Sequence, residues 1–189
     1  MRRLRSGELA ISNLITRGVM RTVWITGLSG AGKTTLSAAI ARQLRVRGCP
    51  VCLLDGDVVR QGLSRDLGFA PADRTENVRR VAEVARLANN CDIFAAVALV
   101  SPFEEDRRAA RDIIGPDRYV EVFLDVPLSV CEARDVKGHY RRARAGTLRA
   151  FTGVSQIYEA PKAPQICISD PGFDIEATAA DIIRRVTGT

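Results

Sequence analysis

The sequence predicts an α/β fold in three layers, with a mostly parallel five-stranded sheet covered by helices on both faces. Short apolar segments of strand character alternate with longer segments in which apolar residues recur at helical spacing. One short segment, 93–100, is apolar throughout, which is typical of a strand that is covered on both faces. The 189 residues are 46% hydrophobic and 26% charged, a composition that suits one globular domain.

The individual elements follow from apolar spacing and from the glycines and prolines between them. Strands are expected at 23–26, 51–54, 93–100, 119–124 and 166–168. Helices are expected at 34–47, at 74–90, after Pro102, from Pro127 and at 175–186, with Gly48 ending the first of them. The main domain is expected at 21–189. Residues 1–20 are an N-terminal extension in which Leu9, Ile11, Leu14 and Ile15 form the packing face of a short helix.

The charge balance favours anionic small molecules as ligands. Lys and Arg number 28 against 22 Asp and Glu, a formal net charge of +6. Such an excess suits nucleic acid, an anionic membrane surface or anionic substrates. The arginines are not gathered into one tail and few aromatic residues lie among them, so a polynucleotide partner is not expected.

The N-terminus and the cysteines indicate a cytoplasmic protein. The basic start is followed by an apolar stretch that Ser12 and Asn13 interrupt, too short and too polar for a signal peptide or a membrane span. The five cysteines are an odd number, and Cys49-x-x-Cys52 has no matching second pair. Neither a zinc site nor a disulfide framework is therefore expected. The cysteines are expected to be reduced thiols.

A phosphate-binding loop lies between the first strand and the first helix. The segment GLSGAGKT at 27–34 matches G-x-x-x-x-G-K-[ST] in full. Its glycines let the backbone N–H groups turn toward phosphate oxygens, and the helix that follows adds its positive dipole end. This P-loop predicts ATP and Mg²⁺ as cofactors, with Lys33 on the β- and γ-phosphates and the Thr34 hydroxyl on the metal. The residues expected to bind ATP here are Gly27, Leu28, Ser29, Gly30, Ala31, Gly32, Lys33, Thr34 and Thr35.

Two carboxylates follow the second strand, in the segment LDGD at 54–57. At a strand's carboxyl end they face the P-loop across the crevice. One acid can accept a proton from an acceptor hydroxyl, worth about 10²–10⁴-fold in rate, while the other orders Mg²⁺-bound water. A turn in which one Asp caps a helix is the alternative. Guanine motifs of the N-K-x-D type are absent and strand 93–100 ends in Ser101-Pro102, so a kinase is favoured over a GTPase or a motor.

A longer series of segments resembles the adenylylsulfate kinase family from about Val23 to Pro164. The segments are GLSGAGKTT at 27–35, LDGD at 54–57, LGF at 67–69, DRTENVRR at 73–80, SPFEEDR at 101–107, VPLSVCEARD at 126–135, KGHYRRARAG at 137–146 and FTGVSQIYEAP at 151–161. The resemblance implies a P-loop NTPase-type fold with a mobile lid at about 134–153. It also implies transfer of the ATP γ-phosphoryl group to the ribose 3′-hydroxyl of adenylylsulfate. A homodimer and an association with ATP sulfurylase are implied in the same way.

The same resemblance implies roles for single residues. Asp57 and Arg60 are the acceptor-binding pair, with Asp57 as the base, and Phe69 and Phe151 sandwich the acceptor's adenine. The remaining acceptor contacts are Arg74, Asn77, Val100 and the lid residue Lys137, while Arg134 flanks the ATP adenine and Thr34 and Asp55 hold the metal. Ser101 is a catalytic position, for which positioning is favoured over a covalent phosphoserine.

Three positions depart from the family pattern: Val58 beside the base, His139 in the lid and Ala150 before the stacking Phe. These departures leave open the hypothesis that the chain is a related kinase that acts on another nucleotide-activated acceptor. A non-catalytic nucleotide-binding partner of a sulfurylase is the third hypothesis. The intact Lys33, Thr34, Asp57 and Arg74 argue against it, because a sensor needs no base aligned to a hydroxyl.

Overall fold

The computed structural model describes residues 20–188, which contain one five-stranded sheet in the order β2-β3-β1-β4-β5. Every pairing between these strands is parallel, so the sheet predicted as mostly parallel is parallel throughout. The predicted fold class is confirmed. The expected helix face at Leu9, Ile11, Leu14 and Ile15 lies outside the described residues. The strands are β1 (Thr22–Gly27), β2 (Val51–Asp55), β3 (Phe94–Ala98), β4 (Tyr119–Leu124) and β5 (Ile166–Ile168).

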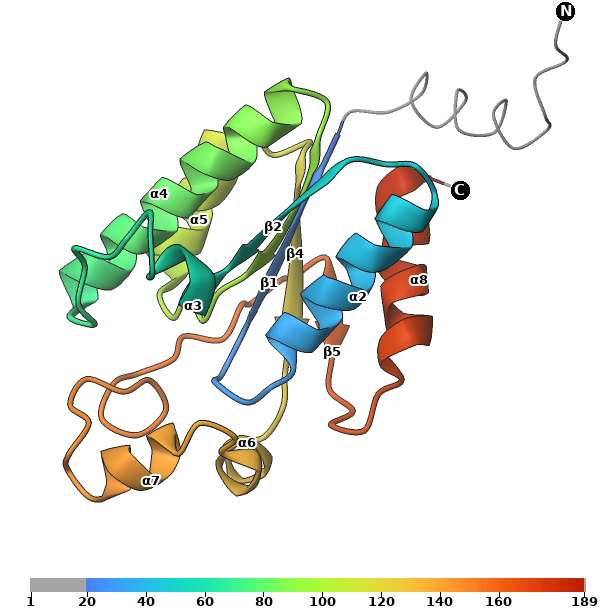
Figure 1. Ribbon diagram of the computed structural model, residues 1–189. Helices are drawn as coiled ribbons and strands as arrows, with labels where there is room; N and C mark the ends of the chain where they lie inside the picture. Colours follow the sequence, from blue (N-terminus) through green and yellow to red (C-terminus); the bar gives the residue numbers. More distant parts are fainter. Residues whose placement is uncertain (1–19, 189) are drawn as a thin grey trace, which may run out of the picture.

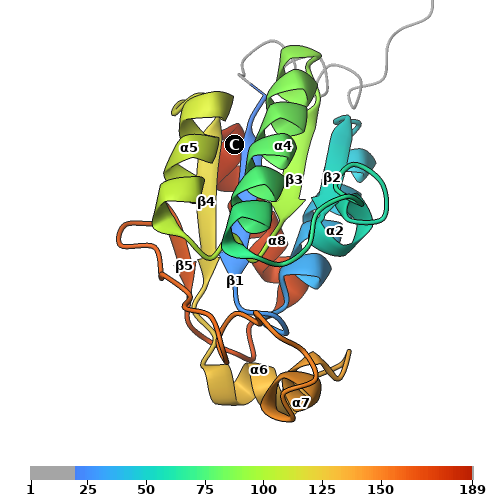
Figure 2. The ribbon, with the colours of Figure 1, turned by 90° about the vertical axis from the view of Figure 1, so that its left-hand side faces the viewer.

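Two helices cover each face of the sheet. On one face lie α2 (Lys33–Val46) and α8 (Ile175–Thr187), and on the other lie α4 (Pro71–Asn90) and α5 (Glu104–Ile114) (Figures 1 and 2). The central strand β1 is buried along its whole length. Its side chains alternate between the layers: Val23 and Ile25 pack with the α2 and α8 side, and Trp24 packs with the α4 and α5 side.

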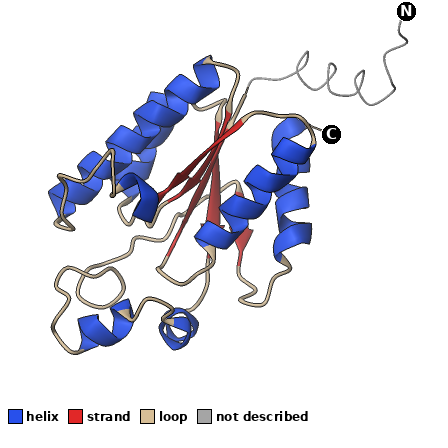
Figure 3. Cartoon of the chain, viewed as in Figure 1, coloured by secondary structure: helices blue, strands red, loops and turns tan. Residues whose placement is uncertain are grey.

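The short helices gather beyond the carboxyl ends of the strands. They are α3 (Gly56–Val59), α6 (Leu128–Arg134) and α7 (His139–Arg144) (Figure 3). Helix α7 lies in the segment that showed no apolar stripe in the sequence. It forms because the Asp135 carboxylate accepts from the backbone N–H groups of Tyr140 and Arg141, and because Tyr140 and Ala143 are buried.

Two element ends differ from the sequence-based expectation in ways that affect the site. Helix α4 begins at Pro71 and not at Arg74, since Pro71 suits a first helical turn after the extended Ala70. Strand β3 ends at Ala98 and not at Val100, so Ser101 lies in a loop with a φ of 37°. No helix among residues 20–188 is long and apolar enough to cross a bilayer.

Candidate active site

A cavity of about 660 Å³ lies at the carboxyl ends of the central strands, a size typical of small-molecule sites. Its walls come from the P-loop, from the segment 55–60, from α4, from the loop 98–102 and from the lid segment 134–140. The sequence-predicted residues that line it are Ser29, Gly30, Ala31, Gly32, Lys33, Thr34, Thr35, Asp55, Asp57, Arg60, Phe69, Arg74, Asn77, Val100, Ser101, Arg134 and Lys137. Gly27, Leu28 and Phe151 are not among the lining residues.

The backbone of the P-loop requires glycine for reasons of space as well as of conformation. Gly27 and Gly30 have φ values of 144° and 78°. A Cβ on Gly27 would lie 2.8 Å from the Leu124 carbonyl oxygen, and one on Gly30 would lie 2.9 Å from the Cys131 carbonyl oxygen. The loop therefore packs directly against β4 and α6, which fixes the position of its N–H groups.

Lys33 is a buried cation at the start of α2. Its Nζ donates to the Leu28 carbonyl oxygen at 2.7 Å, which folds the side chain back over the loop. Burial lowers the pKa of Lys33 to about 8, although Asp55 and Asp57 act in the opposite direction. A phosphate at this position would restore the charged form.

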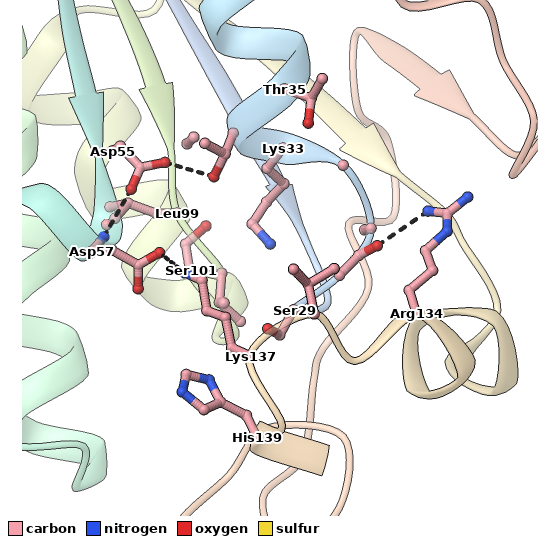
Figure 4. A pocket seen from close by; sticks show the side chains of 18 of the residues that line it. Ser29, Lys33, Thr35, Asp55, Asp57, Leu99, Ser101, Arg134, Lys137 and His139 are labelled. Atoms are coloured by element: carbon pink, nitrogen blue, oxygen red, sulfur yellow. Dashed lines mark hydrogen bonds and ion pairs between the residues drawn. The ribbon is translucent and has the colours of Figure 1, made fainter. Parts of the chain in front are cut away.

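Asp55 connects the P-loop to the second strand's end. Its Oδ2 accepts from the Thr34 hydroxyl at 2.7 Å, and its Oδ1 accepts from the Asp57 backbone N–H at 2.9 Å, which caps α3 (Figure 4). The capping turn considered from the sequence is thus present, and it orients the carboxylate toward Thr34. These two side-chain oxygens at the cavity fit Mg²⁺, which takes few protein ligands beside phosphate oxygens and water. Among residues 20–188 no cluster of three or more His, Cys, Asp or Glu side chains offers another metal site.

Asp57 lies across the cavity from the P-loop and forms an ion pair with Lys137 of the lid (Figure 4). Both side chains are about half exposed, 59% for Asp57 and 51% for Lys137. Asp57 is therefore accessible to a substrate hydroxyl, whereas Asp55 is buried. The two carboxylates thus differ: Asp57 is exposed to the cavity, and Asp55 is bonded to the P-loop residue Thr34.

Two guanidinium groups flank Phe69 on the acceptor side. The Cζ atoms of Arg60 and Arg74 lie 4.5 and 5.5 Å from the ring centroid of Phe69. Within residues 20–188 neither arginine has a carboxylate at ion-pair distance. Burial and the charge of Arg60 lower the pKa of the buried Arg74 to about 10. Two cations without a partner anion at one cavity wall favour an anionic ligand.

Arg74 and Asn77 lie inside α4, since the helix begins at Pro71 and not at Arg74 as the expected range 74–90 had it. The Arg74 backbone N–H donates to the Ala70 carbonyl, so the longer helix has used this amide and only the side chains face the cavity. Asn77 is buried, and its Oδ1 has no hydrogen-bond partner within the described chain. A buried amide oxygen at a cavity calls for a donor such as a ligand hydroxyl.

Ser101 lines the cavity, and a hydrogen-bonded network holds its hydroxyl. It is 3% exposed, its Oγ accepts from Trp24 Nε1 at 3.1 Å, and it donates to Thr26 Oγ1 at 2.9 Å. Thr26 in turn donates to the Val100 carbonyl oxygen at 2.8 Å. The proton of Ser101 is therefore directed away from the phosphate loop, toward β1.

The wall beside the P-loop includes residues that the sequence did not indicate. Arg134 donates to the carbonyl oxygens of Gly30 and Pro171, at 3.1 and 2.6 Å. Phe173 lies against the loop, since a Cβ on Gly32 would be 3.6 Å from its ring. The segment 171–173 carries no motif, and it joins the site through the contact with Arg134 and through Phe173 beside Gly32.

Phe151 packs into the lid and not along the cavity. Its ring meets Tyr140 edge-on at 4.9 Å and His139 at 6.0 Å between centroids. Tyr140 is buried and donates to the Ser29 carbonyl oxygen at 2.9 Å. Of these lid rings His139 lines the cavity beside Lys137, whereas Phe151 is not among the lining residues (Figure 4).

The sheet order, the P-loop and the paired carboxylates across the cavity define a P-loop protein of the kinase type. The chain matches the model of the adenylylsulphate kinase family over residues 19–169. An adenylyl-sulfate kinase of Aeromonas salmonicida (strain A449) is 49% identical over 161 residues, which are 85% of this chain and 82% of that protein. One of Synechococcus sp. (strain JA-3-3Ab) is 54% identical over 150 residues, 79% of this chain and 83% of the other.

A solved structure agrees with these sequence relatives. The APS kinase of Mycobacterium tuberculosis, in complex with AMPPNP and APS, superposes with a TM-score of 0.85 at 40% identity, over 92% of this chain and all of that one. The chain belongs to the adenylylsulphate kinase family.

Proposed function

We propose that the chain transfers the γ-phosphoryl group of ATP to the 3′-hydroxyl of adenylylsulfate, giving 3′-phosphoadenylylsulfate and ADP. The observation that carries this proposal is the arrangement of one cavity. The P-loop with Lys33 lies on one side, and on the other lies Asp57 with two arginines that have no carboxylate at ion-pair distance among residues 20–188. The first side suits a triphosphate and the second suits an anionic acceptor with a hydroxyl near a carboxylate. The known neighbour with AMPPNP and APS supports the same pair of ligands.

The reaction needs positioning and charge stabilisation more than covalent chemistry. The acceptor 3′-oxygen attacks the γ-phosphorus as the bond to the β,γ-bridging oxygen breaks, and the hydroxyl proton passes to the Asp57 carboxylate. Lys33 and, after it leaves Asp57, Lys137 stabilise the charge on the transferring group. Mg²⁺ bound at Thr34 and Asp55 would neutralise charge on the β- and γ-phosphate oxygens.

Ser101 serves this reaction as a positioning residue. Its hydroxyl is held by Trp24 and Thr26, and its carbonyl oxygen accepts from Arg107 Nη1 at 2.7 Å. These bonds support the turn that brings Val100 to the cavity wall. A direct γ-phosphoryl transfer between two bound nucleotides balances without a phosphoserine.

The remaining sequence-based expectations become part of the proposal. These are an extension at 1–20, a kinase domain at 21–189 with a lid at about 134–153, self-association, association with ATP sulfurylase and a cytoplasmic location. Phe69 and Phe151 are proposed to enclose the acceptor's adenine once the lid moves Phe151 toward the cavity. Arg134 is proposed to flank the ATP adenine together with Phe173.

The deciding experiment is a coupled ADP-release assay with purified protein, ATP, Mg²⁺ and adenylylsulfate, followed by identification of the product's phosphorylation site. Release of ADP with formation of 3′-phosphoadenylylsulfate is expected. A matched panel with AMP, adenosine and other nucleotide conjugates tests the related-kinase hypothesis. ADP release with one of these and not with adenylylsulfate would overturn the proposed acceptor.

A further inference from the structure

Gln156 lies in the same tight loop as Phe151. Among residues 20–188 it makes no hydrogen bond to the P-loop, to Asp55 or to Asp57. Its backbone N–H donates to the Phe151 carbonyl oxygen at 3.1 Å, and its own carbonyl oxygen accepts from Gly153 N at 2.8 Å. These bonds join both ends of the segment 151–156. The position of the Gln156 side chain is therefore fixed relative to Phe151.

The Gln156 side chain reaches from this loop to Arg74 on α4. Its Oε1 accepts from Arg74 Nε at 3.0 Å. This amide orientation follows from chemistry, because arginine offers only donors, and it lets Gln156 Nε2 donate directly to the Phe69 carbonyl oxygen at 3.4 Å. The same Arg74 Nε donates to the Phe69 carbonyl oxygen at 3.1 Å, and Nη2 donates to the Ala150 carbonyl oxygen at 2.9 Å.

One guanidinium group thus joins the two chain segments that carry the aromatic residues. Phe69 contributes its own carbonyl, and Ala150, with a φ of 58°, immediately precedes Phe151. The Gln156 side chain, at the other end of the segment 151–156, supplies a third acceptor for Arg74. The separation of the segments around Phe69 and Phe151 depends on these bonds.

The neutrality of the Gln156 side chain also affects the net charge around Arg74. Arg74 is buried and lacks a carboxylate at ion-pair distance among the described residues, so its positive charge remains uncompensated. A carboxylate in place of the amide would orient the guanidinium equally well but would neutralise it. A neutral acceptor orients Arg74 and leaves its charge available for an anionic ligand.

We propose that Gln156 is a positioning residue for the acceptor site, acting through Arg74. It orients the guanidinium toward the anionic group of adenylylsulfate and sets the separation of the segments that carry Phe69 and Phe151. This inference rests on the proposed function, because it names how the same site binds its acceptor.

The test compares the wild type with Gln156→Met, which keeps the length of the side chain but removes both the acceptor oxygen for Arg74 and the Nε2 donor to the Phe69 carbonyl. We expect the KM for adenylylsulfate to rise about 3- to 10-fold, because one bond to a charged group is lost and others remain. The KM for ATP, the kcat and the thermal midpoint should change little. An unchanged KM for adenylylsulfate, or an equal rise in both KM values, would overturn the positioning role.

Two further variants separate orientation from charge. Gln156→Glu keeps an acceptor but adds a negative charge, so its KM for adenylylsulfate should rise more than that of Gln156→Met. A wild-type KM in this variant would contradict the requirement for a neutral side chain. Ile157→Gln is the matched control, since this neighbour is 73% exposed and should leave both KM values unchanged.

A double-mutant cycle with Arg74→Lys tests whether Gln156 acts through Arg74. The Gln156→Met effect should disappear in the Arg74→Lys background, and full additivity would exclude this route. Calorimetric Kd values for adenylylsulfate, measured on the same proteins, distinguish this inference from the proposed function. A wild type that binds adenylylsulfate without phosphorylating it would overturn the activity alone, whereas an unchanged Kd and KM in Gln156→Met would overturn the positioning role alone.

Discussion

Lys137 of the lid forms an ion pair with Asp57, the carboxylate that faces the acceptor side of the cavity. Pairs as exposed as this one contribute about 0–1 kcal/mol, so a substrate can replace either partner at little cost. The pair joins the lid to the segment after β2 at the wall of the cavity. When this ion pair breaks, Asp57 and Lys137 are freed together. The position of the lid is thereby coupled to whether the Asp57 carboxylate is free.

Asp57→Asn should reduce kcat by at least about 10²-fold, the usual contribution of a positioned base. The fold should persist, because the α3 cap is supplied by Asp55 and not by Asp57. Steady-state kinetics and thermal unfolding measure the two effects. A rate close to that of the wild type would remove Asp57 from the mechanism.

Lys137→Met should lower kcat by roughly 10- to 10³-fold through loss of positive charge at the transferring phosphoryl group. Stability should change by less than about 1 kcal/mol, as expected for an exposed pair. Lys162→Met is the matched control, because Lys162 also pairs with an exposed carboxylate, Glu104, and does not line the cavity. Equal kinetics for the two variants would show that Lys137 has no catalytic part.

Ser101→Ala should cost about 1–3 kcal/mol in the free energy of unfolding, because the buried Trp24 N–H loses its acceptor. The kcat should fall less than about tenfold, since the Ser101 hydroxyl is bonded to Trp24 and Thr26 and direct transfer needs no phosphoserine. Urea unfolding and turnover measured on one preparation test both statements. Complete loss of turnover in a stably folded variant would instead support a covalent role.

Phe69→Ala should weaken binding of adenylylsulfate by about 1–3 kcal/mol, the range for stacking of one base on one ring. ATP binding should be unaffected. Phe69 is a cleaner test than Phe151, because its ring is 50% exposed whereas Phe151 also packs on Tyr140. Leu87→Ala, at an exposed apolar position on α4, serves as the control, and equal losses for both nucleotides would contradict the stacking role.

The affinity for ATP should decrease as the pH rises above about 8. The pKa of Lys33 is lowered to about 8 by burial, so the free protein carries a protonated Lys33 below this pH and loses the proton above it. Phosphate binding favours the protonated form of Lys33, so binding above pH 8 requires the uptake of a proton. The Kd for ATP should therefore increase by at most about tenfold for each pH unit above this value. Calorimetry between pH 7 and 9.5 measures this slope, which Lys33→Met should abolish. A wild-type Kd that stays constant across this range would refute the assignment.

The parts of the fold that could be predicted were those encoded by local sequence. Apolar periodicity located the five strands and the four covering helices, and the glycine spacing at 27–34 located the phosphate loop, because both depend on neighbouring residues alone. Helix α7 was missed because its stability comes from the Asp135 cap and from burial of Tyr140, which a search for an apolar stripe does not detect.

The functional site also has parts that the sequence predicts and parts that only the tertiary structure decides. By itself the sequence determined the P-loop, the two carboxylates after β2 and the resemblance that names the acceptor. Only the tertiary structure decided which carboxylate is exposed, where the Ser101 proton points and that Gln156 contacts Arg74, 82 residues away. The physical reason is that these properties depend on burial and on contacts between distant segments, and neither exists until the sheet brings the segments together.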